Sequence, residues 1–476
     1  MANTIIGRKR EKEELINLYH SKRAEFVTVY GRRRVGKTFL INNHFENNFT
    51  FKVTAIHDNS KELQLKNFAT SLFEYSKLKN SNTPLLSDWF DAFGELRKLI
   101  EKSKDKRKVI FFDEMPWFDT KKSNFISAFE HFWNGWASTQ NDILLIVCGS
   151  AASWIVKKLF RNRGGLHNRI TRRILLQPFS LAETRLYAHR EGLPVDEVSL
   201  LETYMTFGGI PYYLSLLNSK SSLMQNINQL CFTDGGELRD EYNNLYASLF
   251  GNTSRHVLVV EALGKKKSGL TREEIKNITR LPEGGSLSAI LEDLELSGFI
   301  RKYAPFMRSK KGMIYQLIDH FTLFHLAFIK GSSTNMPDFW IKMRDTAAFY
   351  AWRGYAFEQV CLSHVPQIIK ALGVSGVISH VESWRSGHST PGAQIDLLIN
   401  RNDRVISLCE MKFSDSEYSI TKKTAQELRN KRNVFIEETE TKKTVQIALI
   451  TPFGLKRNDY FDMVHSVVTA EDLMND

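Results

Sequence analysis

The stretch FVTVYGRRRVGKTF, residues 26–39, indicates how the first part of the chain folds. Its first five residues are β-branched or aromatic and predict a short strand, and residues 39–45 predict a helix. Between them, Gly31–Thr38 matches G-x-x-x-x-G-K-T, a phosphate-binding loop that joins a strand to a helix. Glycines let the backbone wrap around phosphates, and a helix N-terminus offers free N–H groups and positive dipole charge. The stretch therefore predicts a nucleotide site.

Two side chains of this loop have expected chemical roles. Lys37 should neutralise the β- and γ-phosphates of ATP, and Thr38 should place its hydroxyl on Mg²⁺. A chance glycine-rich turn is the alternative, but the predicted strand and helix on either side argue against it. The expected nucleotide contacts here are Gly31, Arg32, Arg33, Arg34, Val35, Gly36, Lys37, Thr38 and Phe39. ATP and Mg²⁺ are the predicted cofactors.

Two continuous apolar runs, Val109–Phe112 and Ile143–Cys148, are typical of strands buried on both faces of a parallel sheet. The first run delivers Asp113 and Glu114 to the carboxyl edge of such a sheet, where ligands bind. Asp113 should hold Mg²⁺ through water, and Glu114 should orient or deprotonate the attacking water. A plain helix cap is the alternative for this acidic pair. Ser150 follows the second run and is expected to sense the γ-phosphate.

Alternating strand and helix patterns over the first 150 residues predict a doubly wound α/β domain with a parallel sheet. The motifs along roughly the first 300 residues are Ile6-Gly7-Arg8 with Glu11 and Glu14, Gly31–Thr38, Val109–Glu114, Cys148-Gly149-Ser150 and Gly208-Gly209-Ile210-Pro211. Together they resemble AAA+-related P-loop ATPases of the archaeal type, close to the signal-transducing STAND ATPases. The resemblance implies that Ile6, Gly7 and Arg8 border the adenine, and that Pro211 packs near the base from a helical lid. A loop before a helix is the alternative for Pro211, since proline is favoured in a first helical turn.

Arg169, Arg172 and Arg173 follow the strand that ends near Ser150. An arginine here could reach the γ-phosphate of a neighbouring copy and stabilise transition-state charge, as an arginine finger does. That role would make the protein a homo-oligomer. Arg172 and Arg173 could equally be the solvent side of a strand, and both interpretations stay open.

A compact unit with the pattern of a winged helix-turn-helix follows. Its predicted helices and strands are His256–Leu263, Thr271–Ile278, Leu287–Ser297, Phe299–Tyr303 and Met313–Leu317. Thr271 with Glu274 three residues later predicts a capping box at the second helix. The loop between the strands carries Arg308, Lys310 and Lys311, which we expect to contact nucleic-acid phosphates.

The C-terminal part contains a hairpin with charged residues among apolar ones. Asp396 lies in the predicted strand 395–399, and Glu410 and Lys412 share one face of the predicted strand 405–413. Asp396 should lie beside them, with Glu358 on the preceding helix. Carboxylates suit Mg²⁺, so Glu358, Asp396 and Glu410 are candidate metal ligands. A metal there could polarise a phosphodiester while Lys412 steadies the nucleophile or the developing charge, making Asp396, Glu410 and Lys412 candidate catalytic residues.

The spacing Glu358…Asp396…Glu410-x-Lys412 resembles the PD-(D/E)XK nuclease core. Many archaeal-type ATPases carry a C-terminal domain of this kind, so the resemblance implies an α/β restriction-endonuclease-like domain. Gln394 stands where such proteins commonly show Glu, which alters a flank but no required ligand. Solvated charges in an ordinary hairpin are the alternative. A nuclease-like fold can also persist as a binding module that cuts nothing.

Length and charge complete the expectations. The chain has 476 residues, and 65 Lys and Arg against 53 Asp and Glu leave a net charge of +12, which favours nucleic acid, DNA first, as partner. The predicted parts are a P-loop ATPase core at 1–180, a helical lid at 181–250, the winged helix at 251–330 and the nuclease-like domain at 345–476. Four scattered cysteines, no signal-peptide pattern and no membrane-length apolar run predict a cytoplasmic protein without a membrane partner.

Three functions fit these observations. The leading hypothesis is a Mg²⁺-ATP-dependent ATPase that binds DNA and positions it for a C-terminal metal-dependent nuclease-like domain. The alternative is an ATP-operated regulatory switch whose winged helix binds DNA or a protein and whose nuclease fold is inactive. The third is a chaperone-like remodeller of proteins. Metal-dependent DNA cutting separates the first from the others, and DNA-stimulated ATP hydrolysis separates the first two from the third.

Overall fold

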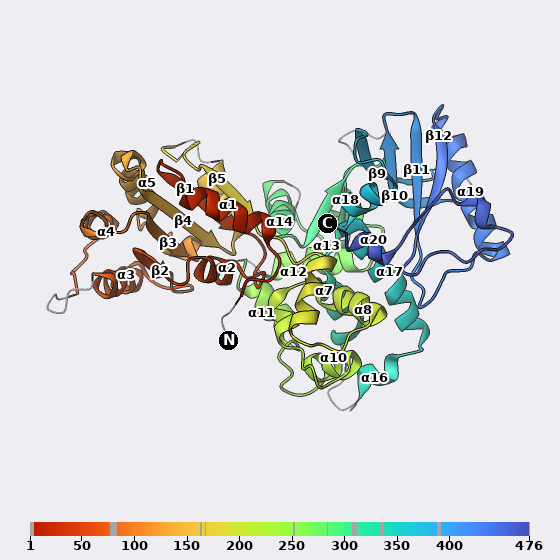
Figure 1. Ribbon diagram of the computed structural model, residues 1–476, viewed down its shortest axis with the longest axis horizontal. Helices are drawn as coiled ribbons and strands as arrows, with labels where there is room; N and C mark the ends of the chain where they lie inside the picture. The colour runs from red at the N-terminus through yellow and green to blue at the C-terminus, as the bar shows by residue number, and fades with distance from the viewer. Residues whose placement is uncertain are drawn as a thin grey trace. The chain divides into compact units, whose positions relative to one another are not determined.

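The computed structural model describes residues 4–76, 83–161, 164–166, 168–250, 253–282, 284–306, 312–332, 338–387 and 392–475. The chain divides into two compact units, Met1–Pro178 and Phe179–Asp476, which are described separately below (Figure 1). Among the described residues, no helix is both long and apolar enough to cross a membrane.

The first unit is built on a five-stranded parallel sheet in the order β2-β3-β4-β1-β5. Its strands are β1 (Glu25–Tyr30), β2 (Phe51–Thr54), β3 (Lys108–Asp113), β4 (Ile143–Gly149) and β5 (Arg172–Leu175). All neighbours run parallel, so their carboxyl ends meet at one edge. The α/β parallel-sheet prediction is therefore confirmed. Because β4 lies between β1 and β3, the phosphate loop and Asp113 come from strands separated by one strand.

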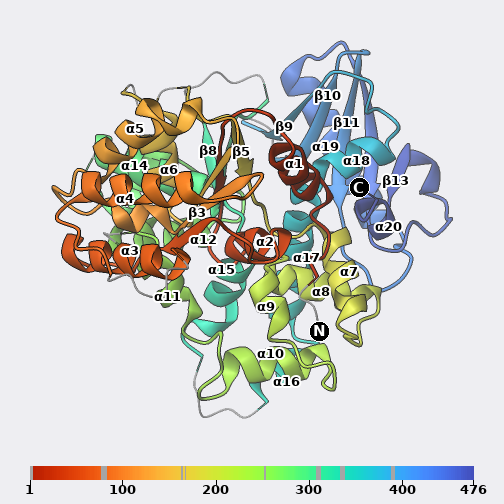
Figure 2. The ribbon, with the colours of Figure 1, turned by 60° about the vertical axis from the view of Figure 1, so that its left-hand side comes forward.

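Helices pack against this sheet, because that contact buries their apolar faces. They are α1 (Lys9–Tyr19), α2 (Lys37–His44), α3 (Lys61–Tyr75), α4 (Trp89–Lys102), α5 (Phe125–Gly135) and α6 (Ala152–Ile155). Helices α3, α4 and α5 lie beside one another in the first unit (Figure 2). An aromatic core joins them to one face of the sheet, where Phe68, Phe93 and Phe129 surround Phe112 of β3. This core is the framework that fixes the strand ends carrying the site.

The second unit begins with helices α7 (Leu181–Arg190), α8 (Glu197–Phe207), α9 (Pro211–Ser215), α10 (Leu223–Phe232) and α11 (Glu241–Ala247). Next come α12 (Thr253–Gly264), α13 (Arg272–Thr279), α14 (Gly285–Leu296) and the antiparallel strands β6 (Leu270–Thr271), β7 (Ile300–Tyr303) and β8 (Ile314–Leu317). The predicted capping box is confirmed, since Thr271 and Glu274 each bond the backbone N–H of the other. Arg308, Lys310 and Lys311 lie outside the described residues.

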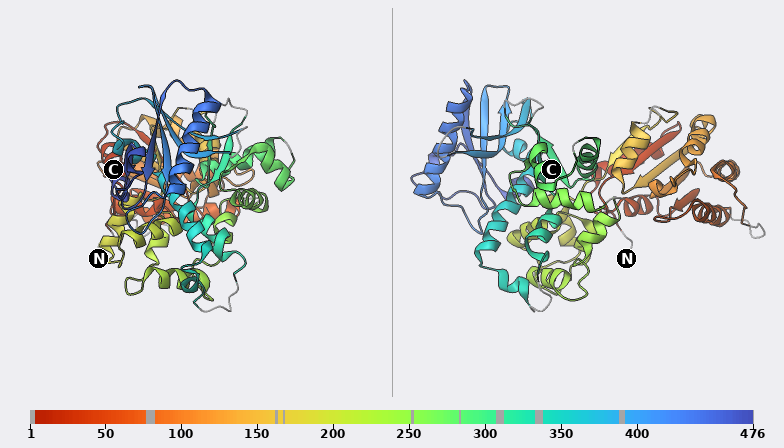
Figure 3. Two further views of the ribbon diagram at one scale, coloured as in Figure 1. Left: turned by 90° about the vertical axis from the view of Figure 1, so that its right-hand side faces the viewer. Right: turned by 180° about the vertical axis from the view of Figure 1, so that it is seen from behind.

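The rest of the second unit holds a mixed sheet, drawn in blue in Figure 3. Its strand order is β13-β12-β11-β10-β9. Its strands are β9 (Ser379–Arg385), β10 (Gln394–Arg401), β11 (Val405–Met411), β12 (Thr444–Ile450) and β13 (Ser466–Val468). Strands β9, β10 and β11 are antiparallel neighbours, whereas β11, β12 and β13 run parallel. The helices here are α15 (His320–Phe324), α16 (Phe339–Met343), α17 (Ala347–Ser363), α18 (Val365–Ala371), α19 (Lys422–Thr439) and α20 (Ala470–Leu473).

Buried polar contacts fasten the parts of the second unit to one another. The Arg353 guanidinium on α17 forms an ion pair with Glu202 of α8, Nε to Oε1 3.0 Å, and a second pair with Asp415 beyond β11. The backbone N–H of Leu181 donates to Nε2 of His364 at 3.0 Å. Helices α7 and α8 are thus tied to residues more than 150 positions away in sequence.

A separate contact joins β7 to the C-terminal sheet. Just after β7, Pro305 pairs with Ser383 of β9, and the N–H of Phe306 donates to the Ser383 carbonyl at 2.7 Å. The ring of Phe306 is buried 5.2 Å from that of Phe435 on α19. The segment that follows β7 therefore pairs with the edge strand β9 of the mixed sheet.

Candidate nucleotide site and C-terminal carboxylate cluster

Two glycines make the phosphate loop possible. Gly31 has φ 146°, and a Cβ there would lie 2.3 Å from the carbonyl oxygen of Leu176. Gly36 has φ 86° and occupies the N-cap of α2, in the left-handed region that favours glycine. The loop consequently turns from the end of β1 into α2 with its backbone close-packed, as the motif predicts.

Lys37 lies inside the loop and is 4% exposed. Its Nζ donates to the carbonyl oxygens of Gly31 at 3.1 Å and Arg32 at 2.9 Å. An ammonium group held by two loop carbonyls keeps the loop curved around the predicted phosphate position. The same group can exchange these carbonyls for phosphate oxygens.

Thr38 and Asp113 come together across the sheet edge. The Thr38 hydroxyl lies 3.0 Å from both carboxylate oxygens of Asp113. Burial raises the pKa of Asp113, and the neighbouring Glu114 charge adds to that effect, while the bond from Thr38 opposes it. A hydroxyl and a carboxylate are hard oxygen donors, so the two residues predicted to hold Mg²⁺ fit that ion.

Glu114 and Ser150 form a second pair at this edge. The Ser150 N–H donates to Glu114 Oε2 at 3.1 Å, and its hydroxyl donates to Oε1. Glu114 has φ 48°, a left-handed conformation that is uncommon for a residue with a side chain. The ends of β3 and β4 thus place Glu114, the predicted water-activating carboxylate, in contact with Ser150, the predicted phosphate sensor.

The other predicted nucleotide contacts divide between the two units. Arg8 has φ 53°, is buried and donates to the Val35 carbonyl of the loop at 3.2 Å, so the segment Ile6-Gly7-Arg8 reaches the phosphate loop. Phe39 is 44% exposed on α2. Pro211 belongs to the second unit, where it is the first residue of α9. Its predicted place near the base stays a prediction.

The three arginines lie on the surface of the first unit. Arg169 precedes β5, and Arg172 and Arg173 lie on it, all three exposed. Arg172 Nε is 3.9 Å from a Glu14 oxygen, and the Arg173 guanidinium lies 4.3 Å from the Phe160 ring centroid. The arginine-finger role, and with it the homo-oligomer, stays a prediction.

Glu410 in the C-terminal sheet is held by two lysines. Its Oε1 is 2.9 Å from Lys412 Nζ, and its Oε2 is 2.6 Å from Lys431 Nζ of α19. Burial would raise the pKa of Glu410, but Lys431 and Lys412 together lower it. Lys412 was predicted here from the sequence, but Lys431 was not, because nothing in the sequence of α19 shows which of its lysines faces β11.

Asp396 lies at a β-bulge, since the pairing of β10 with β9 shifts between Ile395 and Leu398. A bulge changes the direction in which a side chain points. The β10–β11 register, with Leu397 opposite Cys409, puts Asp396 opposite Glu410. Gln394 Nε2 donates to Asp396 at 2.6 Å. The hairpin therefore places the two carboxylates on adjacent strands.

Glu358 of α17 completes the cluster. Burial, and then the charges of Asp396 and Glu410, raise the pKa of Glu358 to about 7. Among the described residues, however, no group of three or more His, Cys, Asp or Glu side chains is arranged to hold a metal ion. The three carboxylates stay candidate metal ligands by prediction alone.

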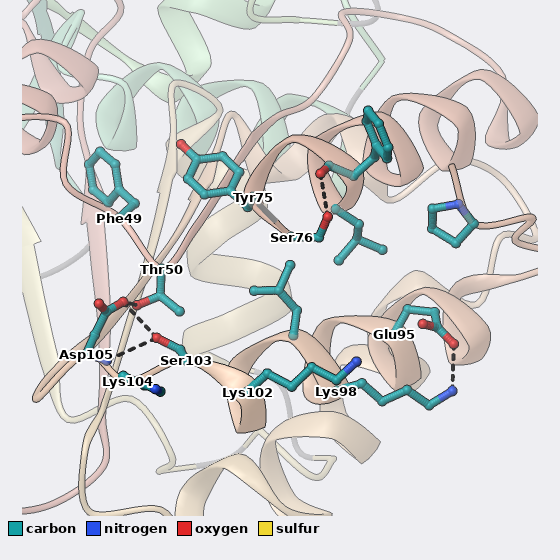
Figure 4. Close-up of a pocket in the computed structure, with 14 residues that line it drawn as sticks. Phe49, Thr50, Tyr75, Ser76, Glu95, Lys98, Lys102, Ser103, Lys104 and Asp105 are labelled. Atoms are coloured by element: carbon teal, nitrogen blue, oxygen red, sulfur yellow. Dashed lines mark hydrogen bonds and ion pairs between the residues drawn. The ribbon is translucent and has the colours of Figure 1, made fainter. Parts of the chain in front are cut away.

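A cavity of about 450 Å³ in the first unit lies between the ends of α3 and α4 (Figure 4). Thr50 and Asp105, which precede β2 and β3, line it and share a 2.7 Å hydrogen bond. The cavity is therefore at the amino ends of these strands, opposite the phosphate loop. Its lining residues include none of the predicted site residues.

A parallel sheet whose strand ends join a phosphate loop to paired Thr38–Asp113 and Glu114–Ser150 defines a P-loop ATPase domain. Residues 6–217 match a family described as an ATPase domain predominantly from Archaea, and this part of the chain belongs to that family. The predicted archaeal-type ATPase is thereby confirmed at the level of this domain.

Two proteins of Methanocaldococcus jannaschii are similar to the chain. An uncharacterized protein is 25% identical over 435 residues, 90% of this chain and 91% of that protein. An uncharacterized ATP-binding protein is 45% identical over 42 residues, 9% of this chain and 71% of that protein.

Two solved structures also align with the chain. The Walker-type ATPase of Pyrococcus abyssi has a TM-score of 0.49 at 18% identity and covers 68% of this chain and 96% of that one. The ORC2 protein of Aeropyrum pernix has a TM-score of 0.41 at 12% identity, with 68% and 95% covered.

Proposed function

We propose that this protein is a Mg²⁺-dependent ATPase whose nucleotide state controls a nucleic-acid-binding, nuclease-like second unit. The observation that supports the ATPase chemistry best is the convergence of Lys37, Thr38–Asp113 and Glu114–Ser150 at one sheet edge. When bound, Mg²⁺ would neutralise charge on the phosphates. Thr38 and Asp113 are the residues that would hold it.

The residues of the site suggest an order of events. Lys37 exchanges its two loop carbonyls for phosphate oxygens. The γ-phosphate competes with Glu114 for the two donors of Ser150, so nucleotide binding releases the Glu114 carboxylate. A released carboxylate can accept a proton from water and orient it for attack. The pairing of Glu114 with Ser150 thus keeps the base inactive until a triphosphate arrives.

Two substitutions test the ATPase assignment. Lys37→Ala should abolish ATP binding or turnover, because the phosphates lose the only lysine of the motif. Glu114→Gln should keep ATP binding and stop hydrolysis. Lys12→Ala, at a partly exposed lysine of α1, is the matched control and should retain both. Normal turnover in both site variants would refute the assignment.

The nuclease-like role is supported by the Asp396–Glu410 juxtaposition, by Lys412 on Glu410 and by the net charge of +12. Asp396→Ala and Lys412→Ala should each remove metal-dependent cutting of plasmid or linear DNA. ATP hydrolysis should remain nearly unchanged, since these residues lie in the second unit. Cutting that survives both substitutions would locate the nuclease activity elsewhere.

One observation favours the regulatory switch as the second candidate function. Helix α14, the third helix of the predicted winged helix, carries Glu292, Asp293 and Glu295 and has no Lys or Arg. Phosphates repel an acidic helix, so α14 is better suited to contact a basic protein partner than DNA. Reversing Arg308, Lys310 and Lys311 to Glu should weaken DNA binding and flatten its salt dependence if the wing binds DNA. Unchanged affinity and salt slope would favour the switch.

A further inference from the structure

A cavity in the second unit lies where β7 meets the C-terminal sheet. Its volume is about 620 Å³, within the range of small-ligand sites. One wall is aliphatic, from Val365, Pro366 and Ile369 at α18. Arg301 and Tyr303 of β7 and the bulged Asp396 of β10 also line it. The site therefore combines an apolar wall with several polar side chains.

Strand β7 is held in this position by its own contacts. The Pro305–Ser383 pairing and the buried Phe306 ring fasten the end of β7 to the C-terminal sheet. Arg301 Nε donates to Gln316 Oε1 at 2.9 Å, and its guanidinium carbon lies 5.6 Å from the Tyr303 ring centroid. Residues 301 and 303 share one face of the strand, because alternate side chains point the same way. The cavity is thus incomplete without β7, which follows helices α12, α13 and α14 in the chain.

The chemistry of these groups narrows the ligand class. An aliphatic wall and an aromatic ring suit the faces of a planar heterocycle. A carboxylate accepts from an exocyclic amine, while a guanidinium donates to ring nitrogens or carbonyl oxygens. Asp396 and Arg301 act on one another, since burial lowers the pKa of Arg301 and the charges of Tyr303, Tyr355 and Asp396 oppose that effect.

We propose that this cavity binds a nucleobase bearing an exocyclic amine, with Arg301 and Tyr303 as its binding residues beside Asp396. The proposal rests on the nucleic-acid role proposed for the second unit and names the part of the substrate read there. A base enters such a site only when it is unpaired. The base comes either from a single strand or from a free nucleotide.

The test is binding of fluorescein-labelled hexamers of deoxycytidine and thymidine to the full chain, in EDTA and with saturating inorganic pyrophosphate, which has no base, to occupy the phosphate loop. Thymine lacks the exocyclic amine, so the cytidine hexamer should bind more tightly. Arg301→Gln should weaken its binding about tenfold, because a hydrogen bond from a charged donor is lost. Val381→Trp, at the 48% exposed Val381 of the cavity lining, should fill the cavity and weaken binding similarly without touching Arg301.

Lys302→Gln is the matched control. It also removes one positive charge from β7, but Lys302 points to the opposite face, 3.5 Å from Glu295, and binding should change less than about twofold. Displacement by free dCMP would identify a nucleotide as the ligand, and binding of the hexamer alone would identify a strand. Equal binding of the two hexamers, no binding, or equal binding by all variants would overturn the proposal. EDTA removes the metal, so this assay measures binding without cutting. If the chain binds the cytidine hexamer here but cuts no DNA in the metal-containing assay, only the nuclease role is refuted.

Discussion

Replacing Arg353 by leucine should strongly destabilise the second unit. Arg353 is 4% exposed, and its ion pair with Glu202 is closed to solvent on both sides. The substitution leaves Glu202 buried without its arginine. Burial already raises the pKa of Glu202, which Arg353 opposes, so the variant should force Glu202 toward its protonated form.

The magnitude follows from this burial. Removing one partner of a buried ion pair costs about 3–5 kcal/mol, because the remaining charge is uncompensated. The pair with Asp415 adds little, since that side chain is 57% exposed. In a unit of this size the loss should lower the melting temperature by on the order of 10 °C. Arg353→Leu combined with Glu202→Leu should recover much of it, since both charges are then absent.

Differential scanning calorimetry of the full chain measures the effect. Inorganic pyrophosphate has no base and should stabilise only the unit that holds the phosphate loop, so the transition that it does not shift belongs to the second unit. Arg185→Leu is the control, because Arg185 pairs with the exposed Glu471 at 2.6 Å and should cost about 1 kcal/mol or less. If Arg353→Leu costs no more than Arg185→Leu, or the double variant is as unstable as the single one, the reasoning is wrong.

Other substitutions test different parts of the molecule. Gly31→Ala should cost about 1–3 kcal/mol of stability and weaken ATP binding, measured by thermal shift with ADP, because its Cβ would meet a carbonyl oxygen at 2.3 Å. Burial lowers the pKa of His325 to about 4. As the pH falls from 6.5 toward 4, His325 is therefore protonated in the unfolded chain but stays neutral in the folded chain. About 3 kcal/mol of stability should be lost across that window, and His325→Phe should abolish this loss in unfolding curves. Phe306→Ala should lower the free energy of unfolding by about 3–5 kcal/mol and speed proteolysis between β7 and β9, because the contact with Phe435 is lost. Unchanged stability and unchanged proteolysis would show that this contact is dispensable.

Local sequence signals predicted the strands, loop and helix that form the candidate nucleotide site. The strand 26–30, the loop and the following helix are specified by neighbouring residues, and the structure has β1, the loop and α2 in those places. Asp113 and Glu114 follow an apolar run that is typical of a buried strand, and the structure has β3 there. Parallel strands then bring their carboxyl ends together, which explains why Ser150 reaches Glu114.

Contacts between distant segments could not be predicted from neighbouring residues. Arg353, Arg301 and Lys431 are single charged residues in helices or strands, and no spacing distinguishes them from solvated charges. Their partners are set by packing of elements far apart in the chain. The β-bulge at Asp396 also escaped prediction, because it depends on how β9 pairs with β10. Strand β2 was missed because four residues at a sheet edge give little periodic signal.

The bonds of α7 and α8 to α17 have a consequence for synthesis of the chain on the ribosome. Arg353, the ion-pair partner of Glu202, lies 151 residues further along the chain. His364, which accepts from the Leu181 N–H, lies 183 residues further along. Domains generally fold from the N-terminus as they emerge, and contacts of long sequence separation form slowly. The first unit can therefore fold early, while α7 and α8 keep apolar surface and a buried carboxylate position open until α17 has left the exit tunnel. During that interval the exposed apolar surface of the second unit favours aggregation.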